Sequence, residues 1–241
     1  MRCSVRPCYG QTVRRRPSWA PPIPLTELRA ADLGQQGVVF EHSSGAYRST
    51  GKNLSSGGMG DVFLMARQDP TTGELEPVVG KVFHSEYLYQ LRTDEVTRAD
   101  HETVQRNLHT ISAIGHPHIL PTLVAENIAD NYLTVSPLKH GTLLEAMRVH
   151  QPPPPRQRVT VLMQALSGMA KLHEHGFIHR DFTLRNVLVD PPCENAFLFD
   201  FDLTLAQSEV AGCSYKDRYK GRIFGSPGYS VPPEILSLIH I

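Results

Sequence analysis

Four polar side chains in this chain have the types that phosphoryl transfer requires. Asp181 and Asn186 stand five residues apart within His179–Asn186 (HRDFTLRN), and Asp200 follows nineteen residues after Asp181. A carboxylate beside an attacking hydroxyl can take its proton, while an amide oxygen and a second carboxylate can hold metal ions against phosphate oxygens. Lys81, in an upstream apolar run, could pair its ammonium group with the phosphates.

A glycine-rich segment upstream could hold the triphosphate itself. Ser55–Val62 (SSGGMGDV) contains Gly57, Gly58 and Gly60 and leads into a β-prone run. Glycines let the backbone approach phosphates closely and direct its N–H groups at them. Rival nucleotide motifs fit less well, because a dinucleotide fingerprint opens a helix and the P-loop requires GK[ST], which Gly51–Asn53 (GKN) lacks.

These segments together match the motifs of one family. HRDFTLRN fits the pattern H-R-D-x-x-x-x-N, and Asp200–Asp202 (DFD) ends an apolar strand at a compatible spacing. From about residue 47 to its end, the chain resembles a eukaryotic-type protein kinase, truncated at its C-terminus. The resemblance implies ATP and Mg²⁺ as cofactors, and protein substrates as partners.

The resemblance also assigns roles to individual residues. Asp181 would be the catalytic base, assisted by Lys81, Asn186 and Arg180, and Asn186 and Asp200 would hold the two magnesium ions. The implied ATP contacts are Leu54, Gly57, Gly58, Gly60, Val62, Lys81, Val135, Ser136 and Leu138. Among these, Val135 would be the gatekeeper, and the backbones of Ser136 and Leu138 would meet adenine.

The chain departs from the family pattern at three places that bear on function. Asp202 replaces the glycine of the usual DFG, a change we expect to be tolerated because aspartate adopts unusual φ values more readily than most residues. Thr183 stands where serine/threonine kinases usually carry lysine, and Arg185 resembles the tyrosine-kinase pattern. Serine/threonine specificity is favoured, with dual or tyrosine specificity as the alternative.

The helix residue that should pair with Lys81 has two candidates in this sequence. Counting back from His116 by the family's spacing reaches Asn107, and the nearest upstream glutamate is Glu102. Five residues turn a helix by roughly 140° net, onto another face. We predict that a shifted or irregular helix presents Glu102 to Lys81, and the alternative is that Asn107 substitutes weakly.

The order of elements predicts an α+β fold of two lobes, because strands come first, helices later, and no βαβ alternation occurs. We expect a small β-rich N-lobe with one helix and a partial helical C-lobe. Strands are predicted over 78–83, 119–124, 132–135 and 196–199, and helices over 91–114 and beyond Pro155, where Val161, Ala165, Met169 and Leu172 share one face.

Domain boundaries follow from composition. Residues 1–46 are expected to form a disordered basic, proline-rich tail, 47–138 the N-lobe and hinge, and 139–235 the partial C-lobe. Residues 236–241 (LSLIHI) match one reading frame of a transposase adaptor used in sequencing libraries, so we predict a non-native tail there.

Bulk composition narrows the classes of partner. The formal net charge is zero, which gives no indication of nucleic-acid binding, and no apolar run approaches the ~20 residues of a membrane helix. Four scattered cysteines without CxxC spacing favour reduced thiols in an intracellular, cytoplasmic protein. The oligomeric state stays open.

Two functions remain after these observations. An active ATP:protein phosphotransferase is favoured because Lys81, Asp181, Asn186 and Asp200 are all retained. The alternative is a pseudokinase, which would bind nucleotide or act as a scaffold without turnover.

Overall fold

The computed structural model describes residues 21–56, 60–83, 95–149 and 152–207. The helices are α1 (Ala30–Leu33), α3 (Glu95–Ser112), α4 (Leu143–Arg148), α5 (Pro155–Glu174) and the short 3₁₀ turns η1 (Leu184–Asn186) and η2 (Phe201–Leu203). The strands are β1 (Gln36–His42), β2 (Gly45–Ser56), β3 (Gly60–Gln68), β4 (Leu75–Phe83), β5 (Val124–Asn127), β6 (Tyr132–Pro137), β7 (Gly141–Thr142), β8 (Phe177–Ile178), β9 (Val187–Val189), β10 (Ala196–Leu198) and β11 (Leu205–Ala206).

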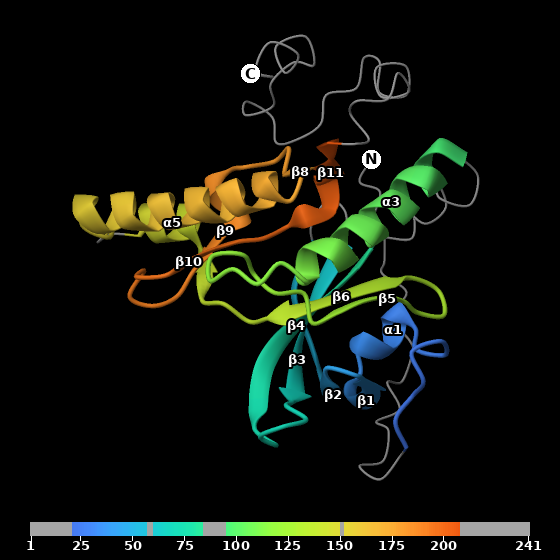
Figure 1. The fold of residues 1–241 in the computed structure, drawn as a ribbon. Coiled ribbons are helices and arrows are strands. Elements are labelled where there is room, and N and C mark those ends of the chain that lie inside the picture. Colours follow the sequence, from blue (N-terminus) through green and yellow to red (C-terminus); the bar gives the residue numbers. More distant parts are fainter. Residues whose placement is uncertain (1–20, 57–59, 84–94, 150–151, 208–241) are drawn as a thin grey trace, which may run out of the picture.

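The N-terminal half of the described chain forms an antiparallel sheet of order β1-β2-β3-β4-β6-β5 (Figure 1). Burial alternates along β4, where Val78, Gly80 and Val82 are buried while Val79 and Lys81 are half-buried. This alternation is what a pleated strand produces when only one face is fully covered. The α+β, two-lobed arrangement is therefore confirmed, with α3 as the long helix of the small lobe.

The prediction that residues 1–46 are disordered is wrong for residues 21–46, and residues 1–20 lie outside the described ranges. Leu28 and Leu33 are completely buried, and the rings of Phe40 and Tyr47 stack at 5.0 Å. Backbone contacts fix the segment as well, since the Ile23 N–H donates to the carbonyl of Val39 at 2.7 Å. Tertiary burial thus orders a segment whose proline-rich composition predicted disorder.

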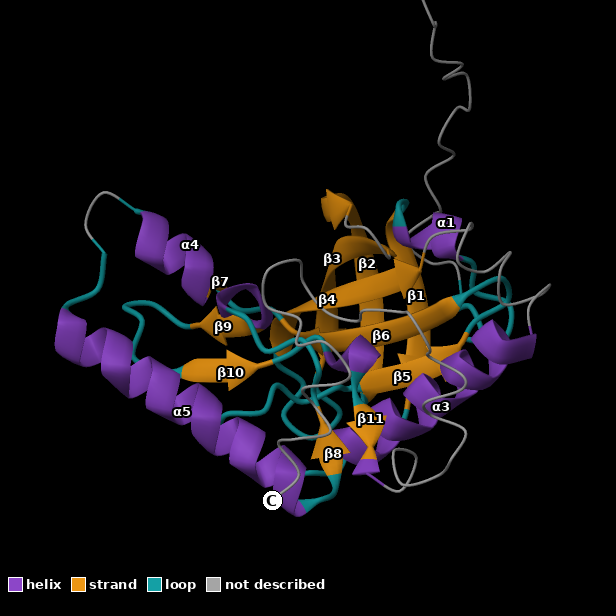
Figure 2. Cartoon of the chain, turned by 90° about the horizontal axis from the view of Figure 1, so that it is seen from above, coloured by secondary structure: helices purple, strands orange, loops and turns teal. Residues whose placement is uncertain are grey.

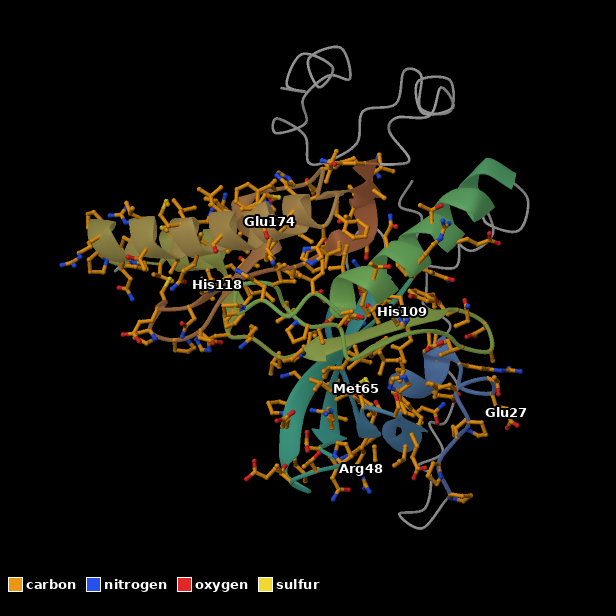
Figure 3. The ribbon with its side chains drawn as sticks, viewed as in Figure 1. Glu27, Arg48, Met65, His109, His118 and Glu174 are labelled. Carbon is orange, nitrogen blue, oxygen red and sulfur yellow. The ribbon has the colours of Figure 1, made fainter. Side chains whose placement is uncertain are left out.

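The N-terminal segment covers the sheet face that carries the buried side chains of the small lobe. Met65 of β3 lies inside this lobe, whereas Glu27 of the N-terminal segment lies at its outer surface (Figure 3). α1 adds a polar anchor, because the Ala30 N–H donates to Asp130 Oδ1 at 2.9 Å. The small lobe therefore begins by residue 21 rather than at residue 47.

A second apolar core joins α3 to the C-terminal half. It contains Leu108 and Ile111 from α3, Phe83 and Tyr132 from the sheet, and Phe201 from η2. Figure 2 shows α5 alongside β10, away from the small lobe's sheet. The predicted face of α5 is largely confirmed: its buried residues are Val161, Ala165, Gly168 and Leu172, with Met169 partly buried against the same core.

Most of the remaining element predictions hold, with one displaced strand. The strand predicted over 119–124 is wrong in its bounds, because β5 begins at Val124 and Ile119 makes only an isolated bridge to Leu198. His116–Leu120 instead packs as a turn against α5 and β10, where the Leu120 N–H donates to the Leu198 carbonyl at 2.9 Å. None of the helices in the described ranges is long and apolar enough to cross a membrane. The end of the predicted C-lobe and the tail at 236–241 lie outside those ranges.

Candidate active site

The loop between β8 and β9 holds the predicted base in a defined position. The side-chain amide Nδ2 of Asn186 donates to Asp181 Oδ2 at 2.7 Å and to the Asp181 carbonyl at 2.9 Å. Asn186 is buried at the end of η1, a turn that Thr183 caps by accepting from the Arg185 N–H. The structure therefore brings Asp181 and Asn186, the predicted base and a predicted metal ligand, into contact.

The buried ring of His179 links this loop to the segment before Asp200. Its ring is 1% exposed, Nε2 lies 3.0 Å from the Phe199 carbonyl, and Nδ1 lies 3.3 Å from the Asp181 N–H. A carbonyl can only accept and a backbone N–H can only donate, so Nε2 carries the proton and the ring is neutral. Burial lowers the pKa of His179 below its ordinary value, in agreement with that neutral form.

Arg180 and Asp200 have strained backbones at the two ends of the site. Their φ values are 65° and 61°, in the left-handed region that non-glycine residues seldom occupy. Arg180 Nε donates to the Leu203 carbonyl, which ties the catalytic loop to η2. Strain of this kind persists where surrounding contacts enforce it, and it clusters at functional sites.

Lys81 is held between two carboxylates of the DFD tripeptide. Its Nζ lies 2.9 Å from Asp200 Oδ1 and 2.5 Å from Asp202 Oδ2. Burial alone would lower the pKa of Lys81, but the charges of Asp202 and Asp200 outweigh it and raise the pKa above its ordinary value. The lysine is therefore a fixed positive charge at the junction of the lobes.

The two carboxyl groups shift in opposite directions. Burial would raise the pKa of Asp200, but the Lys81 charge outweighs it and the pKa is lowered. Burial also raises the pKa of Asp202, and here the Lys81 charge does not offset that effect. The neighbouring Asp200 charge raises the Asp202 pKa further. Like charges this close cannot both ionise easily, so Asp200 is the more strongly acidic of the pair.

The predicted partner of Lys81 on α3 is wrong. Glu102 is exposed, and the carboxylates that the described residues bring to Lys81 come from Asp200 and Asp202. The helix keeps regular geometry, so it does not turn Glu102 inward. Asn107 is the buried residue, and its Nδ2 donates to the Thr204 carbonyl at 3.1 Å.

The sheet places one predicted ATP contact, Val62, directly beside Lys81. Val62 of β3 lies directly opposite Lys81, Ser55 of β2 lies opposite Val62, and Thr134 of β6 lies opposite Lys81 on its other side. Residues directly opposite one another in antiparallel strands share a face. Val62, Lys81 and Thr134 are all half-buried, so this face of the sheet is partly exposed among the described residues.

The predicted gatekeeper, Val135, is not part of that face. Its register partner is Gly80, and it is completely buried in the core cluster with Leu133, on the side opposite Lys81. Because side chains alternate along a strand, the residues of β6 on the Lys81 face are Thr134 and Ser136. Ser136 was predicted from its backbone, and Thr134 was missed.

The other predicted contacts are placed as follows. Leu54 is 40% exposed at an irregularity of β2, and Gly57 and Gly58 lie outside the described residues. Gly60 is buried, and a Cβ there would collide with the Val82 carbonyl, so close strand pairing requires this glycine. The Leu138 N–H donates to the Pro77 carbonyl at 3.0 Å, so adenine would have to displace that bond.

The donor set fits magnesium. Asn186 uses its amide nitrogen on Asp181, which directs its oxygen away, and Asp200 contributes a carboxylate. The Phe199 N–H donates to the Asn186 carbonyl at 3.2 Å, which keeps the two segments adjacent. Within the described residues, no group of three or more His, Cys, Asp and Glu side chains could hold a metal alone. Mg²⁺ is commonly held by one or two carboxylates together with substrate phosphates, and this set would supply that protein share.

Three residues of the site depart from the favoured predictions: Asp202, Asn107 and Thr134. Asp202 is a departure from the motif whose signal is chemical, because a buried carboxylate needs a partner and the Lys81 ammonium can be one. Asn107 is the alternative that the family spacing indicates, and it is buried where Glu102 is exposed. Only the strand register shows that Thr134, and not Val135, lies on the Lys81 face of the sheet.

Comparison with known proteins identifies the family. The family described as protein tyrosine and serine/threonine kinase matches residues 49–224, more than half of the chain. Serine/threonine-protein kinase pkn2 of Myxococcus xanthus is 28% identical over 183 residues, covering 75% of this chain and 20% of that protein. NUAK family SNF1-like kinase 1 of Homo sapiens is 26% identical over 144 residues, covering 59% and 21%.

A plant relative gives the same result. CBL-interacting protein kinase 17 of Oryza sativa subsp. japonica is 26% identical over 136 residues, covering 56% of this chain and 29% of that protein. The chain thus spans less than a third of the length of these relatives. With the geometry around Lys81, Asp181, Asn186 and Asp200 described above, the family match leads to one conclusion: this chain belongs to the protein tyrosine and serine/threonine kinase family.

Proposed function

We propose that this chain transfers the γ-phosphoryl group of ATP to hydroxyl groups of proteins, with Asp181 as the base. The Asp181 carboxylate would accept the proton of the hydroxyl whose oxygen attacks the γ-phosphorus, and ADP would leave. The observation that carries the proposal is the 2.7 Å bond from Asn186 to Asp181, which orients the base in a loop buttressed by neutral His179. Positioned proton transfer of this kind contributes about 10²–10⁴-fold to rate.

Charge at the site supports the same chemistry. Asn186 and Asp200 would hold Mg²⁺, which when bound would neutralise charge on the phosphate oxygens. Lys81 would pair with the phosphates, on the sheet face that it shares with Val62 and Thr134. ATP is therefore the proposed cofactor with magnesium, and a protein the proposed acceptor.

Serine and threonine are the proposed acceptor residues. Two observations favour them: the similarity to pkn2, which is named as a serine/threonine-protein kinase, and the structural use of Thr183. Thr183 is 5% exposed and caps η1, so its difference from the usual lysine reflects packing of the loop.

A second candidate function is nucleotide binding without turnover. It is favoured by the bond from the Leu138 N–H to the Pro77 carbonyl, which engages a donor expected to meet adenine, and by the exposure of Glu102. It would retain ATP at the same sheet face and leave Asp181 idle.

One experiment separates the two functions. The full chain is incubated with magnesium, γ-labelled ATP and a generic basic protein substrate, and labelled residues are identified by phosphoamino-acid analysis. Label on serine and threonine that D181N removes, while ATP binding persists, supports the proposal. E74Q, a change at an exposed residue away from the site, should transfer like the wild type. ATP binding with no transfer by the wild-type chain would establish the second candidate instead.

A further inference from the structure

The charge partner of the site lysine comes from an unexpected element. Lys81 Nζ lies closer to Asp202 Oδ2, at 2.5 Å, than to Asp200 Oδ1, at 2.9 Å. Asp202 is 8% exposed and Lys81 is 24% exposed, so this pair is largely withdrawn from water. The α3 residue at the position expected for a glutamate is Asn107, a neutral amide, and Glu102 is exposed.

We propose that Asp202 is the positioning residue for Lys81, in place of a glutamate from the helix. The proposal rests on the phosphotransferase function above, in which Asp200 would hold magnesium. A carboxylate committed to a metal ion is a poor anchor for a lysine, because the cation competes for the same oxygens. Asp202 supplies a second carboxylate that keeps the Lys81 ammonium in place.

The backbone around Asp202 is fixed from three directions, which makes it suited to this task. Arg180 Nε donates to the carbonyl of Leu203, the next residue, and Asn107 Nδ2 donates to that of Thr204. β11, directly after, pairs with β8 through Leu205 and Ile178. The carboxylate of a short side chain on such a turn has little freedom, so its position is defined by the fold.

An aspartate at this position costs no backbone strain. Positive φ values occur at Arg180, Cys193 and Asp200 among the described non-glycine residues, and Asp202 is not one of them. It lies inside the 3₁₀ turn η2, where an ordinary residue is accommodated. A glycine here would give conformational freedom that this turn does not use, and among the described residues it would leave Asp200 as the carboxylate in contact with Lys81.

Asn107 joins α3 to the site, which is one of the two tasks expected of the helix glutamate. Its bond to the Thr204 carbonyl joins α3 to the segment that carries Asp202, at two residues' distance. The helix is therefore tied to the site through an amide–carbonyl bond, while the Asp202 carboxylate lies against the charged ammonium of Lys81. The uncharged amide of Asn107 can make the bond to Thr204, but it cannot form an ion pair with Lys81.

The experiment compares the amide isostere D202N with the wild-type full chain. Phosphotransfer is measured over a range of ATP concentrations. D202N should lower kcat/KM for ATP by at least tenfold, chiefly by raising KM. D190N is the matched control, because Asp190 pairs with Lys139 at 3.2 Å away from the site, and it should stay within twofold of wild type. A D202N chain as active as D190N overturns the proposal.

A second measurement tests the pairing without relying on activity. Thermal midpoints are recorded for wild type, K81M, D202N and K81M/D202N without nucleotide. If Asp202 holds Lys81, D202N shifts the midpoint by a different amount in the K81M background than in the wild type; equal shifts in both backgrounds contradict the pairing. A wild-type chain that shows this coupling but transfers no phosphate would refute the proposed function and leave the Lys81–Asp202 assignment standing.

Discussion

The amide nitrogen of Asn186 bridges the side chain and the backbone carbonyl of Asp181, at 2.7 and 2.9 Å. One residue therefore fixes both the position and the rotation of the proposed base. The carboxylate is pre-oriented before any substrate arrives, and this lowers the cost of reaching a reactive geometry.

Replacing Asn186 with alanine should reduce transfer strongly. N186A removes the bond that orients Asp181 and one proposed magnesium ligand, so we expect kcat to fall by about 10²-fold or more. Steady-state transfer at saturating magnesium measures this. In a magnesium titration, the concentration that gives half-maximal transfer should also be higher for N186A than for the wild type. Unchanged kcat would show that Asp181 needs no orientation from Asn186.

Gly60 should tolerate no side chain. A Cβ at this residue would collide with the Val82 carbonyl in the β3–β4 pairing, so G60A should lower the free energy of unfolding by about 1–3 kcal/mol. Urea unfolding followed by circular dichroism provides the value. G115A is the matched control, because nothing lies within 4 Å of a Cβ there, and it should stay within about 0.5 kcal/mol. Equal effects of the two changes would disprove the close strand approach.

The N-terminal segment should contribute to stability. Leu28 is completely buried against the small-lobe sheet, so L28A should cost about 2–5 kcal/mol of unfolding free energy. L75A, at a residue that is 74% exposed, should cost less than about 0.5 kcal/mol. Chemical denaturation of the two variants decides the matter. A negligible cost for L28A would restore the prediction that this segment is disordered.

His179 should make the fold sensitive to mild acid. Its pKa is lowered by burial in the folded state, so protonation favours the unfolded chain. Its contribution is complete above the unfolded pKa of about 6.5 and is lost as pH falls from there toward the folded pKa, by at most about 1.4 kcal/mol per pH unit. Unfolding free energies at pH 7.5 and 5.5 should therefore fall more steeply for wild type than for H179Q. Parallel slopes would mean that His179 is not held neutral.

The sequence predicted which polar residues lie together better than it predicted which face of a strand or helix each residue occupies. Motif spacing led to Asp181, Asn186, Asp200 and Lys81, and the structure brings Asn186 to Asp181 and Lys81 to Asp200. Val135 was assigned to the site by alignment to a pattern, but a strand register decides which face a residue occupies, and a shift of one residue reverses it. Local pattern does not contain that register.

The same distinction explains two further errors. Glu102 was favoured because it carries a charge, yet on a regular helix it lies on the exposed face and Asn107 is the buried residue. Residues 21–46 were predicted to be disordered because composition does not reveal long-range burial. Leu28 and Leu33 are ordered only by the sheet that follows them in the sequence.

The central claim is most directly tested by a single-turnover measurement of γ-phosphoryl transfer, with the full chain in excess over magnesium and labelled ATP and with protein substrate present. We predict that the wild-type chain and E74Q transfer the label at the same rate, and that D181N, with ATP still bound, is slower by about 10²-fold or more. Transfer by D181N at the wild-type rate would contradict it.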